Sequence, residues 1–293
     1  MYVISGATGN IGGAIAQKLL EKKEKVRVIG RSKEKLKSFE EKGAEAAVGS
    51  LDDPAFLKKA YKGATAVFQM TPPHYTSNDM RGFQRTLGRT AKEAIQAAGV
   101  QYVVDLSSIG AQWAEGVGPV NGLHDVEALL NETSAAIIHL RPAFFMENFY
   151  GMIPLMKQFQ IIAMPIRPTV SFPIIATRDI ADVATKRLLA HHWKGKLTQE
   201  LLGHRTYTGP EIAAILGEAV GQKLNYVQGA PEEARKGIVA AGLSENVADL
   251  FVEMYAAIDS GRMAPTEKRN AENTTPTTLE AFAKSFAAVF KKS

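Results

Sequence analysis

The chain has 293 residues, a formal net charge of +5, a hydrophobic content of 45% and no cysteine. These proportions are those of an ordinary globular protein, and the lack of cysteine excludes disulfides, thiolate metal sites and cysteine nucleophiles. No apolar run approaches the roughly 20 residues that a membrane-spanning helix needs, and a strand predicted from residue 2 leaves no room for a signal peptide. We therefore expect a soluble cytoplasmic protein without membrane attachment, and we predict no metal site.

The N-terminal segment combines a strand, a glycine-rich turn and a helix. Residues 2–4 are rich in β-favouring side chains, and from Ile11 apolar residues recur at helical spacing. Between them lies Gly6-Ala-Thr-Gly9-Asn-Ile-Gly12. Such a turn lets backbone N–H groups approach a pyrophosphate, and the helix N-terminus presents its positive dipole to that anion. The pattern predicts dinucleotide binding, with a glycine turn that holds no ligand as the alternative.

Basic residues follow this unit. Residues 18–37 contain nine Lys or Arg against three Glu, with no interleaved tyrosine or tryptophan, so we interpret most of them as a solvated helix face and expect no nucleic-acid partner. The second predicted strand, residues 25–29, ends at Gly30-Arg31, where NAD enzymes usually place a carboxylate for the ribose 2′-hydroxyl. Arg31, with Lys35 close behind, instead favours a 2′-phosphate and hence NADP(H). The alternative is that Arg31 is a surface residue at the start of a helix.

The next segments alternate between strands and helices. Strands are predicted at residues 44–48, 64–70, 101–106 and 135–140, and helices at 32–42, 55–61, 78–98 and 124–131. This alternation predicts a Rossmann-type doubly wound parallel sheet with strand order 3-2-1-4-5-6. Ser50 and Leu51 fall where this fold brackets an adenine ring. Thr71 and Pro72 follow the fourth strand, whose carboxyl end faces the ribose and nicotinamide.

Past residue 141 the regular alternation stops. We expect an irregular stretch to residue 173, a helix over 178–191 and a short strand over 198–202. A helix over 209–220, a strand over 223–227, two helices within 231–260 and a closing helix over 279–290 follow. The domain prediction is a nucleotide-binding domain at 1–150 and a smaller α+β substrate or lid lobe at 151–293, with 178–202 packing back on the sheet. Residues 112–121 and 150–173 are the expected substrate loops.

Four segments together resemble the NmrA-like group of atypical short-chain dehydrogenases/reductases. They are the glycine turn at 6–12, Ser107-Ser108, the stretch from Arg141-Pro142 to Glu147-Asn148, and Arg178-Asp179-Ile180-Ala181. The group includes NADPH-dependent quinone, azo-dye and triphenylmethane-dye reductases, and redox sensors that bind the dinucleotide without turnover. The resemblance implies pyrophosphate contacts from the glycine turn, a 2′-phosphate contact from Arg31, ribose contacts near the nicotinamide, and backbone and aromatic contacts to its ring. The residues are Gly6, Thr8, Gly9, Asn10, Ile11 and Gly12; Arg31; Thr71, Pro72, Ser107 and Ser108; and Pro142, Ala143 and Phe144.

The standard general acid of the superfamily is missing. None of the eight tyrosines is followed by lysine four residues later. The family often has a lysine four residues before the position of Glu127, and here that residue is Leu123. Its neighbour His124 is the only catalytic residue that we predict, since its unperturbed pKa lies near neutrality, and a half-exposed structural histidine is the alternative.

Two functions fit this pattern. Without a proton donor, ketone reduction and sugar epimerisation are disfavoured, whereas a conjugated acceptor forms a delocalised anion that water can protonate. The leading hypothesis is an NADPH-dependent oxidoreductase that reduces a quinone or similar small aromatic molecule. The alternative is a non-catalytic sensor of NADP(H) that binds a regulatory protein. A homodimer also stays open.

Overall fold

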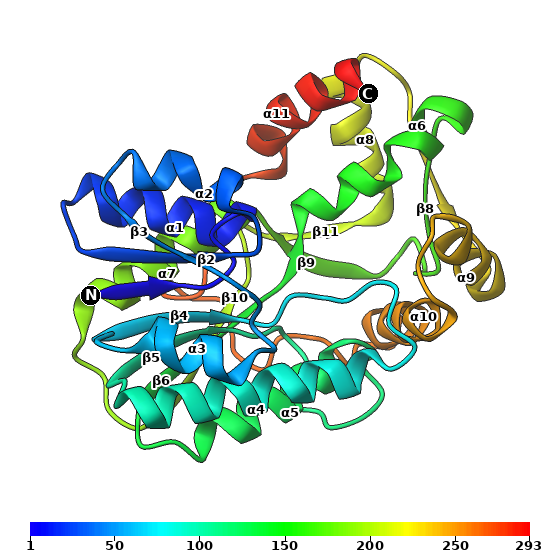
Figure 1. The fold of residues 1–293 in the computed structure, drawn as a ribbon. Helices are drawn as coiled ribbons and strands as arrows, with labels where there is room; N and C mark the ends of the chain where they lie inside the picture. The colour runs from blue at the N-terminus through cyan, green and yellow to red at the C-terminus, as the bar shows by residue number, and fades with distance from the viewer.

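The computed structural model describes residues 1–293 and contains one large parallel sheet. Its seven strands run in the order β10-β6-β5-β4-β1-β2-β3, and every neighbouring pair is parallel (Figure 1). The strands are β1 (Tyr2–Ile4), β2 (Val26–Gly30), β3 (Glu45–Val48), β4 (Ala66–Met70), β5 (Tyr102–Leu106), β6 (Ala136–Pro142) and β10 (Lys196–Leu201). The predicted order of the first six strands is therefore confirmed, and β10 adds a seventh strand beside β6.

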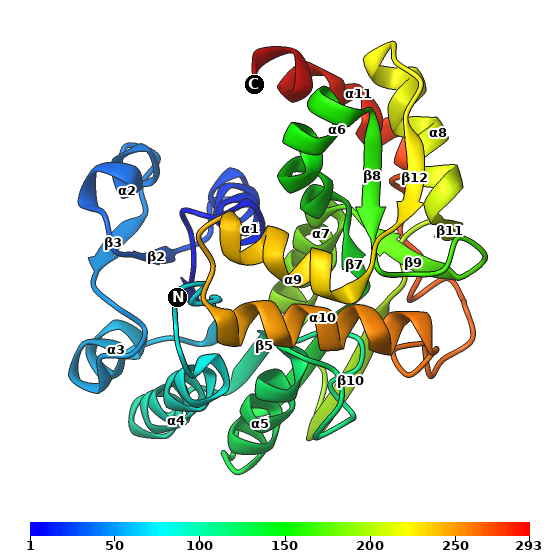
Figure 2. The same ribbon diagram turned by 90° about the vertical axis from the view of Figure 1, so that its right-hand side faces the viewer.

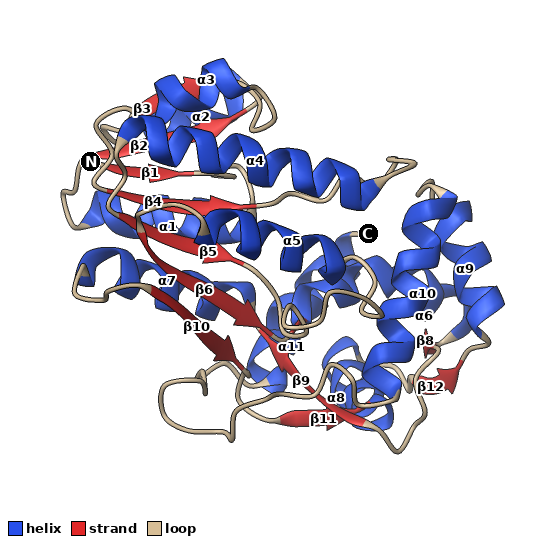
Figure 3. Ribbon diagram, turned by 90° about the horizontal axis from the view of Figure 1, so that it is seen from below, coloured by secondary structure: helices blue, strands red, loops and turns tan.

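Six helices cover the two faces of this sheet (Figure 3). One face carries α1 (Asn10–Glu21), α2 (Lys33–Glu40) and α7 (Thr177–Ala190), and the other carries α3 (Pro54–Tyr61), α4 (Met80–Ala98) and α5 (Val120–Asn131). Successive residues of a strand point to opposite faces. In β1, for example, Ile4 joins the core beneath α1 and Val3 joins the core beneath α4. A doubly wound Rossmann-type fold, as predicted, follows from this arrangement.

Local signals in the sequence set the ends of several helices. Ser32 accepts a hydrogen bond from the Lys35 amide at the start of α2, and Asp53 caps α3, which Pro54 begins. The helix α4 ends at Gly99, whose φ of 62° is the left-handed conformation that glycine adopts without strain. The caps at Ser32 and Asp53 fix βα turns at the carboxyl edge of the sheet, and Gly99 fixes the turn into β5 at the opposite edge.

A smaller lobe lies beyond the carboxyl edge of the sheet (Figure 2). It has its own core of 28 buried apolar residues, to which residues 109–120 of the sheet half also contribute. Its small sheets have the orders β11-β9-β7 and β12-β8. The elements are β7 (Phe144–Phe145), the 3₁₀ segment η1 (Met146–Met152), α6 (Ile153–Phe159), β8 (Ile161–Met164), β9 (Ser171–Ile175), β11 (Thr206–Thr208), α8 (Gly209–Val220), β12 (Asn225–Gln228), α9 (Pro231–Ala240), α10 (Glu245–Asp259) and α11 (Leu279–Lys292).

Two sequence predictions about this region are wrong. The stretch from 141 to 173 is not irregular, because it contains β7, η1, α6, β8 and the start of β9. Its strands pair mostly with distant partners, as Ile161 does with Asn225, so no local pattern in the sequence predicts these pairings. The helix α5 begins at Val120 rather than at 124. Gly122 lies inside the helix, where its lack of a side chain leaves room for Gln84 of α4. No helix of the structure has the length and apolarity to cross a membrane.

Candidate cofactor and substrate site

The glycine turn between β1 and α1 leaves backbone amides open to an anion. Gly6 has a φ of 65°, and a Cβ at Gly12 would lie 2.5 Å from the Gly6 carbonyl oxygen, so both positions require glycine. Gly9 is the N-cap of α1, with no side-chain cap and no acidic residue in the first turn. The first amides of a helix have no intrahelical acceptor, and the dipole there is positive. The turn therefore fits a pyrophosphate.

The turns after β1, β2 and β3 are joined by backbone hydrogen bonds. The Ala7 amide donates to the Ile29 carbonyl at 3.2 Å, and the Gly49 amide donates to the Gly30 carbonyl at 3.1 Å. This brings Arg31 beside the glycine turn, with Ser50 and Leu51 on the next turn. The Arg31 and Lys35 side chains are exposed and form no ion pair. Two exposed cations that follow the turn after β2 suit an adenosine 2′-phosphate.

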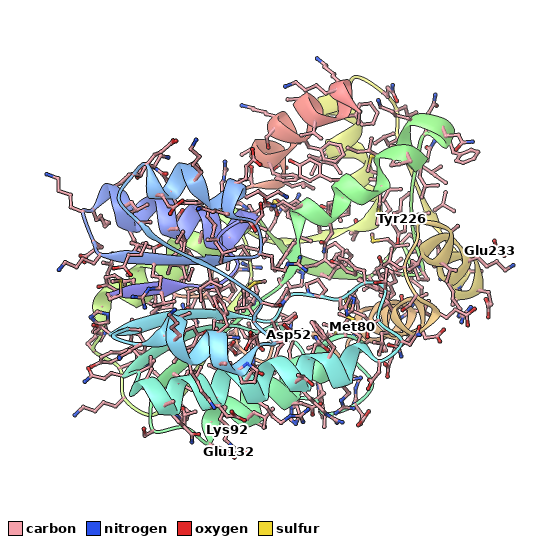
Figure 4. The ribbon with its side chains drawn as sticks, in the orientation of Figure 1. Asp52, Met80, Lys92, Glu132, Tyr226 and Glu233 are labelled. Atoms are coloured by element: carbon pink, nitrogen blue, oxygen red, sulfur yellow. The ribbon has the colours of Figure 1, made fainter.

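A cavity of about 590 Å³ lies at the carboxyl ends of β4, β5 and β6, beneath the lobe. Met70 connects it to the glycine turn, because its side chain occupies the space that a Cβ on Gly6 would need. Met80, at the start of α4, lines the cavity on the side that faces the lobe (Figure 4). Hydrophobic residues make up 17 of the 31 that line the cavity, so it suits an apolar ligand beside a bound dinucleotide.

Five of the predicted residues line this cavity, namely Thr71, Ser107, Ser108, Ala143 and Phe144. The Thr71 hydroxyl is buried without a hydrogen-bond partner. A buried hydroxyl normally has a partner, so this one is suited to a ligand. Pro72 and Pro142 do not line the cavity.

The backbone near Phe144 offers fewer contacts than the sequence suggests. The Pro142 carbonyl accepts from the Ile109 amide at 3.1 Å, and the Ala143 amide donates to the Leu201 carbonyl at 2.9 Å. Both groups are used inside the protein. What this segment presents to the cavity is therefore chiefly the Phe144 ring.

Ser107 is held by a buried ion pair. Its hydroxyl donates to Glu127 Oε1 at 2.5 Å, and Arg141 binds the same carboxylate through two nitrogens at 2.9 and 2.6 Å. Burial alone would lower the pKa of Arg141, but the hydrogen bond and charge of Glu127 outweigh it and raise that pKa. Since the Ser107 hydroxyl donates its hydrogen bond to the carboxylate, it presents oxygen lone pairs to the cavity.

His124 does not lie at the cavity. Its Nδ1 is 2.8 Å from the Ala111 carbonyl oxygen, and its ring is half-buried. The cavity is lined instead by its neighbour Leu123. Adjacent helical residues point about 100° apart, which is why only one of them reaches the site. Because His124 is absent from the lining of the cavity, we propose no catalytic role for it.

Sequence reasoning missed the part of the cavity formed by α10 and the segment after it. Phe251, Met254 and Ile258 line the cavity from α10, and residues 259–261 and 263–265 continue the wall. Helical spacing of apolar residues at 251, 254 and 258 was the available signal. The expected substrate loops contribute less: 112–121 supplies only Pro119 and Val120, and 150–173 supplies residues 170–173.

The parallel sheet, the uncapped glycine turn and the cavity at the carboxyl edge define a Rossmann-type protein. The chain belongs to the NmrA-like family, whose model matches residues 2–283. The predicted family resemblance is thus confirmed.

Relatives of the chain are named as reductases. It is 28% identical over 293 residues to the NAD(P)H azoreductase of Xenophilus azovorans, covering 99% of both proteins. The NADP(H) complex of a triphenylmethane reductase from Citrobacter sp. has a TM-score of 0.82 and 24% identity, with 98% of this chain and 100% of that one covered. The NADPH complex of a quinone oxidoreductase from Escherichia coli has a TM-score of 0.83 and 20% identity, with 98% and 99% covered. These structural likenesses confirm the fold.

Proposed function

We propose that the protein is an NADPH-dependent reductase that transfers hydride to a quinone or a similar conjugated aromatic acceptor. The observation that carries this proposal is the open, largely apolar cavity of about 590 Å³ beside the glycine turn. A cavity in that place can hold a planar acceptor against the nicotinamide end of a bound dinucleotide. The names of the azoreductase, triphenylmethane reductase and quinone oxidoreductase relatives support the same class.

The residues present suit each part of the cofactor. The amides that begin α1 would bind the pyrophosphate, and Arg31 with Lys35 would bind the 2′-phosphate. Ser50 and Leu51 would flank the adenine. Thr71, Ser107 and Ser108 would contact the nicotinamide ribose, and Phe144 would cover the ring. When bound, NADPH supplies the hydride, and the chain positions the acceptor and excludes water.

The cavity walls hold no strong proton donor. Tyr75 and Asp259 are their only titratable residues. Burial raises the pKa of Tyr75, and Asp259 is held by Arg167, whose Nε lies 3.0 Å from Oδ2. An acceptor that stabilises its own negative charge does not need an enzymatic acid, because water can protonate it afterwards. Quinones and azo dyes have this property, whereas simple ketones do not.

Loss of nicotinamide absorbance with a panel of quinones and azo dyes tests the proposal. We expect NADPH oxidation above the enzyme-free rate with at least one acceptor, at a rate proportional to protein concentration. No oxidation with any acceptor would contradict it. If the protein instead changed its light-scattering mass on binding NADPH while turnover stayed negligible, the sensor function would replace the reductase. The open cavity favours the reductase, since a sensor needs no space above the nicotinamide.

A further inference from the structure

The cavity is lined without any basic side chain. None of its 31 lining residues is lysine, arginine or histidine. Its single carboxylate, Asp259, accepts the Arg167 backbone amide at 2.6 Å and the Arg167 Nε at 3.0 Å. Arg167 itself does not line the cavity, so its charge is directed to Asp259. An anionic substituent on a ligand would therefore meet no cation on these walls.

Three serines make the cavity still less suited to an anion. Each of the three hydroxyls donates a hydrogen bond inside the protein. Ser107 donates to Glu127 Oε1, Ser108 to the Ile109 carbonyl at 3.0 Å, and Ser260 to the Ala257 carbonyl at 3.3 Å. With their protons used inside the protein, all three present oxygen lone pairs to the cavity. The remaining donors on the walls, such as the Thr71 hydroxyl and the Asn148 amide, are uncharged. Burying an ionised group without a charged partner costs several kcal/mol.

The apolar walls suit planar rings of varied outline. Phe144 packs edge-to-face on Phe172 with centroids 5.8 Å apart, and both line the cavity. Four of the chain's nine methionines, at 70, 80, 254 and 263, also line it. Methionine side chains adapt to irregular shapes and make favourable contacts with aromatic rings. The shape of a ring system is thus weakly constrained, while its charge is strongly constrained.

We propose that the cavity selects its acceptor by charge: it takes uncharged planar aromatic molecules and rejects those with a sulfonate or carboxylate over the buried ring. The proposal rests on the proposed function for the kind of molecule bound, and it names Leu123 as a position that sets the selection. Leu123 is half-buried and lines the cavity, one helical turn before Glu127, which holds Ser107. A cation placed there would supply the missing partner.

Binding and turnover are measured separately, so that the two proposals can fail independently. Binding uses dimethylaminoazobenzene and its sulfonate, methyl orange, titrated into protein saturated with a tetrahydro analogue of NADPH, whose ring is uncharged and donates no hydride. We expect the uncharged dye to bind at least about 100-fold more tightly. Turnover compares naphthoquinone with naphthoquinone sulfonate and NADPH, after subtraction of the enzyme-free rate. A sulfonate makes a quinone a stronger oxidant, so slower reduction cannot come from its chemistry.

Leu123→Lys is the decisive variant. We expect it to bind methyl orange at least about 10-fold more tightly than the natural protein does and the uncharged dye more weakly. Leu123→Met keeps the preference for the uncharged dye, because it changes shape without charge. Leu197→Lys adds the same charge to an exposed position on the edge strand β10, and we expect it to leave the ratio of the two affinities unchanged. Circular dichroism confirms that each variant is folded.

Equal affinities for the two dyes in the natural protein would overturn the charge selection, as would a Leu123→Lys variant that is folded and still rejects methyl orange. If neither quinone is reduced while the dye titration shows the expected ratio, the reductase proposal fails and the charge selection stands. If both quinones are reduced at similar rates, the charge selection fails and the reductase stands.

Discussion

We expect Arg31 to decide which dinucleotide the protein prefers. It follows β2 directly, and its side chain is exposed without a protein partner. We expect Arg31→Ala to weaken NADPH binding by about 10- to 100-fold, the value of one or two charge-assisted hydrogen bonds, and NADH binding by less than about threefold. Fluorescence titration measures both. Lys37→Ala, which removes an exposed cation from the helix α2 that follows Arg31, is the control. Equal losses for both cofactors would remove the argument for NADP(H).

Asp105 carries a pH-dependent cost at the centre of the sheet. It is 1% exposed, its Oδ2 lies 2.8 Å from His139 Nδ1, and its Oδ1 has no partner. Burial raises the pKa of Asp105, although the hydrogen bond from His139 opposes this. Because the folded pKa lies above the unfolded value of about 3.9, ionising Asp105 costs more in the folded protein than in the unfolded one. The free energy of unfolding of the natural protein therefore falls as the pH rises from about 4 through the folded pKa.

Asp105→Asn keeps an acceptor for His139 without the charge. We expect its free energy of unfolding to match that of the natural protein at low pH and to exceed it by about 1 to 2 kcal/mol at neutral pH. Urea unfolding as a function of pH measures the difference. Asp105→Ala leaves the histidine nitrogen unpaired and should lose about 1 to 3 kcal/mol. If the Asn variant became less stable than the natural protein as the pH rises, the charge of Asp105 would be shown to stabilise the fold.

At the scale of elements, Trp113 makes two contacts with the segment that follows α10. The Arg262 guanidinium lies 4.5 Å from the centre of the Trp113 ring, and Trp113 Nε1 donates to the Arg262 carbonyl at 3.0 Å. We expect Trp113→Ala to speed amide exchange in residues 259–265 by about tenfold, since it removes both contacts. Trp113→Phe keeps a ring over Arg262 and should show a smaller effect. Unchanged exchange in the alanine variant would mean that the other contacts of this segment, such as the hydrogen bond from Arg262 Nη2 to the Glu115 carbonyl at 2.9 Å, are enough to hold it.

The elements that could be predicted from the sequence are those with local signals. The parallel strands are buried on both faces and read as short apolar runs, as in residues 102–106. The glycine turn is equally local. By contrast, β7 has two residues and pairs with β9 about 30 positions later, which no window of sequence reports. The part of the cavity wall that α10 forms is harder still to predict from the sequence, because only the fold places Phe251 and Ser107 around the same cavity. Local chemistry therefore predicted the cofactor turn, whereas the acceptor cavity needed the structure.

At the scale of the whole molecule, cofactor binding should couple to stability. The cofactor turns belong to the sheet half and the cavity is roofed by the lobe, so a dinucleotide would contact only the folded protein. The domain boundary at residue 150 stays a prediction. We expect NADP⁺ at about 100 times its Kd to add about 2.7 kcal/mol, which for a chain of 293 residues is a rise in Tm of roughly 4 °C. Differential scanning fluorimetry measures it, with NAD⁺ at the same concentration as the control. No shift with NADP⁺, or an equal shift with NAD⁺, would contradict the cofactor assignment.

A crystal structure with NADP⁺ bound tests the central claim most directly. We expect the pyrophosphate on the amides of residues 10–12, the 2′-phosphate against Arg31, and nicotinamide C4 facing the cavity between Ser107 and Phe144. We also expect open space within about 4 Å of C4, the range of direct contact, on the face where an acceptor would stack. A cofactor bound elsewhere, or a C4 covered by protein side chains, would contradict it.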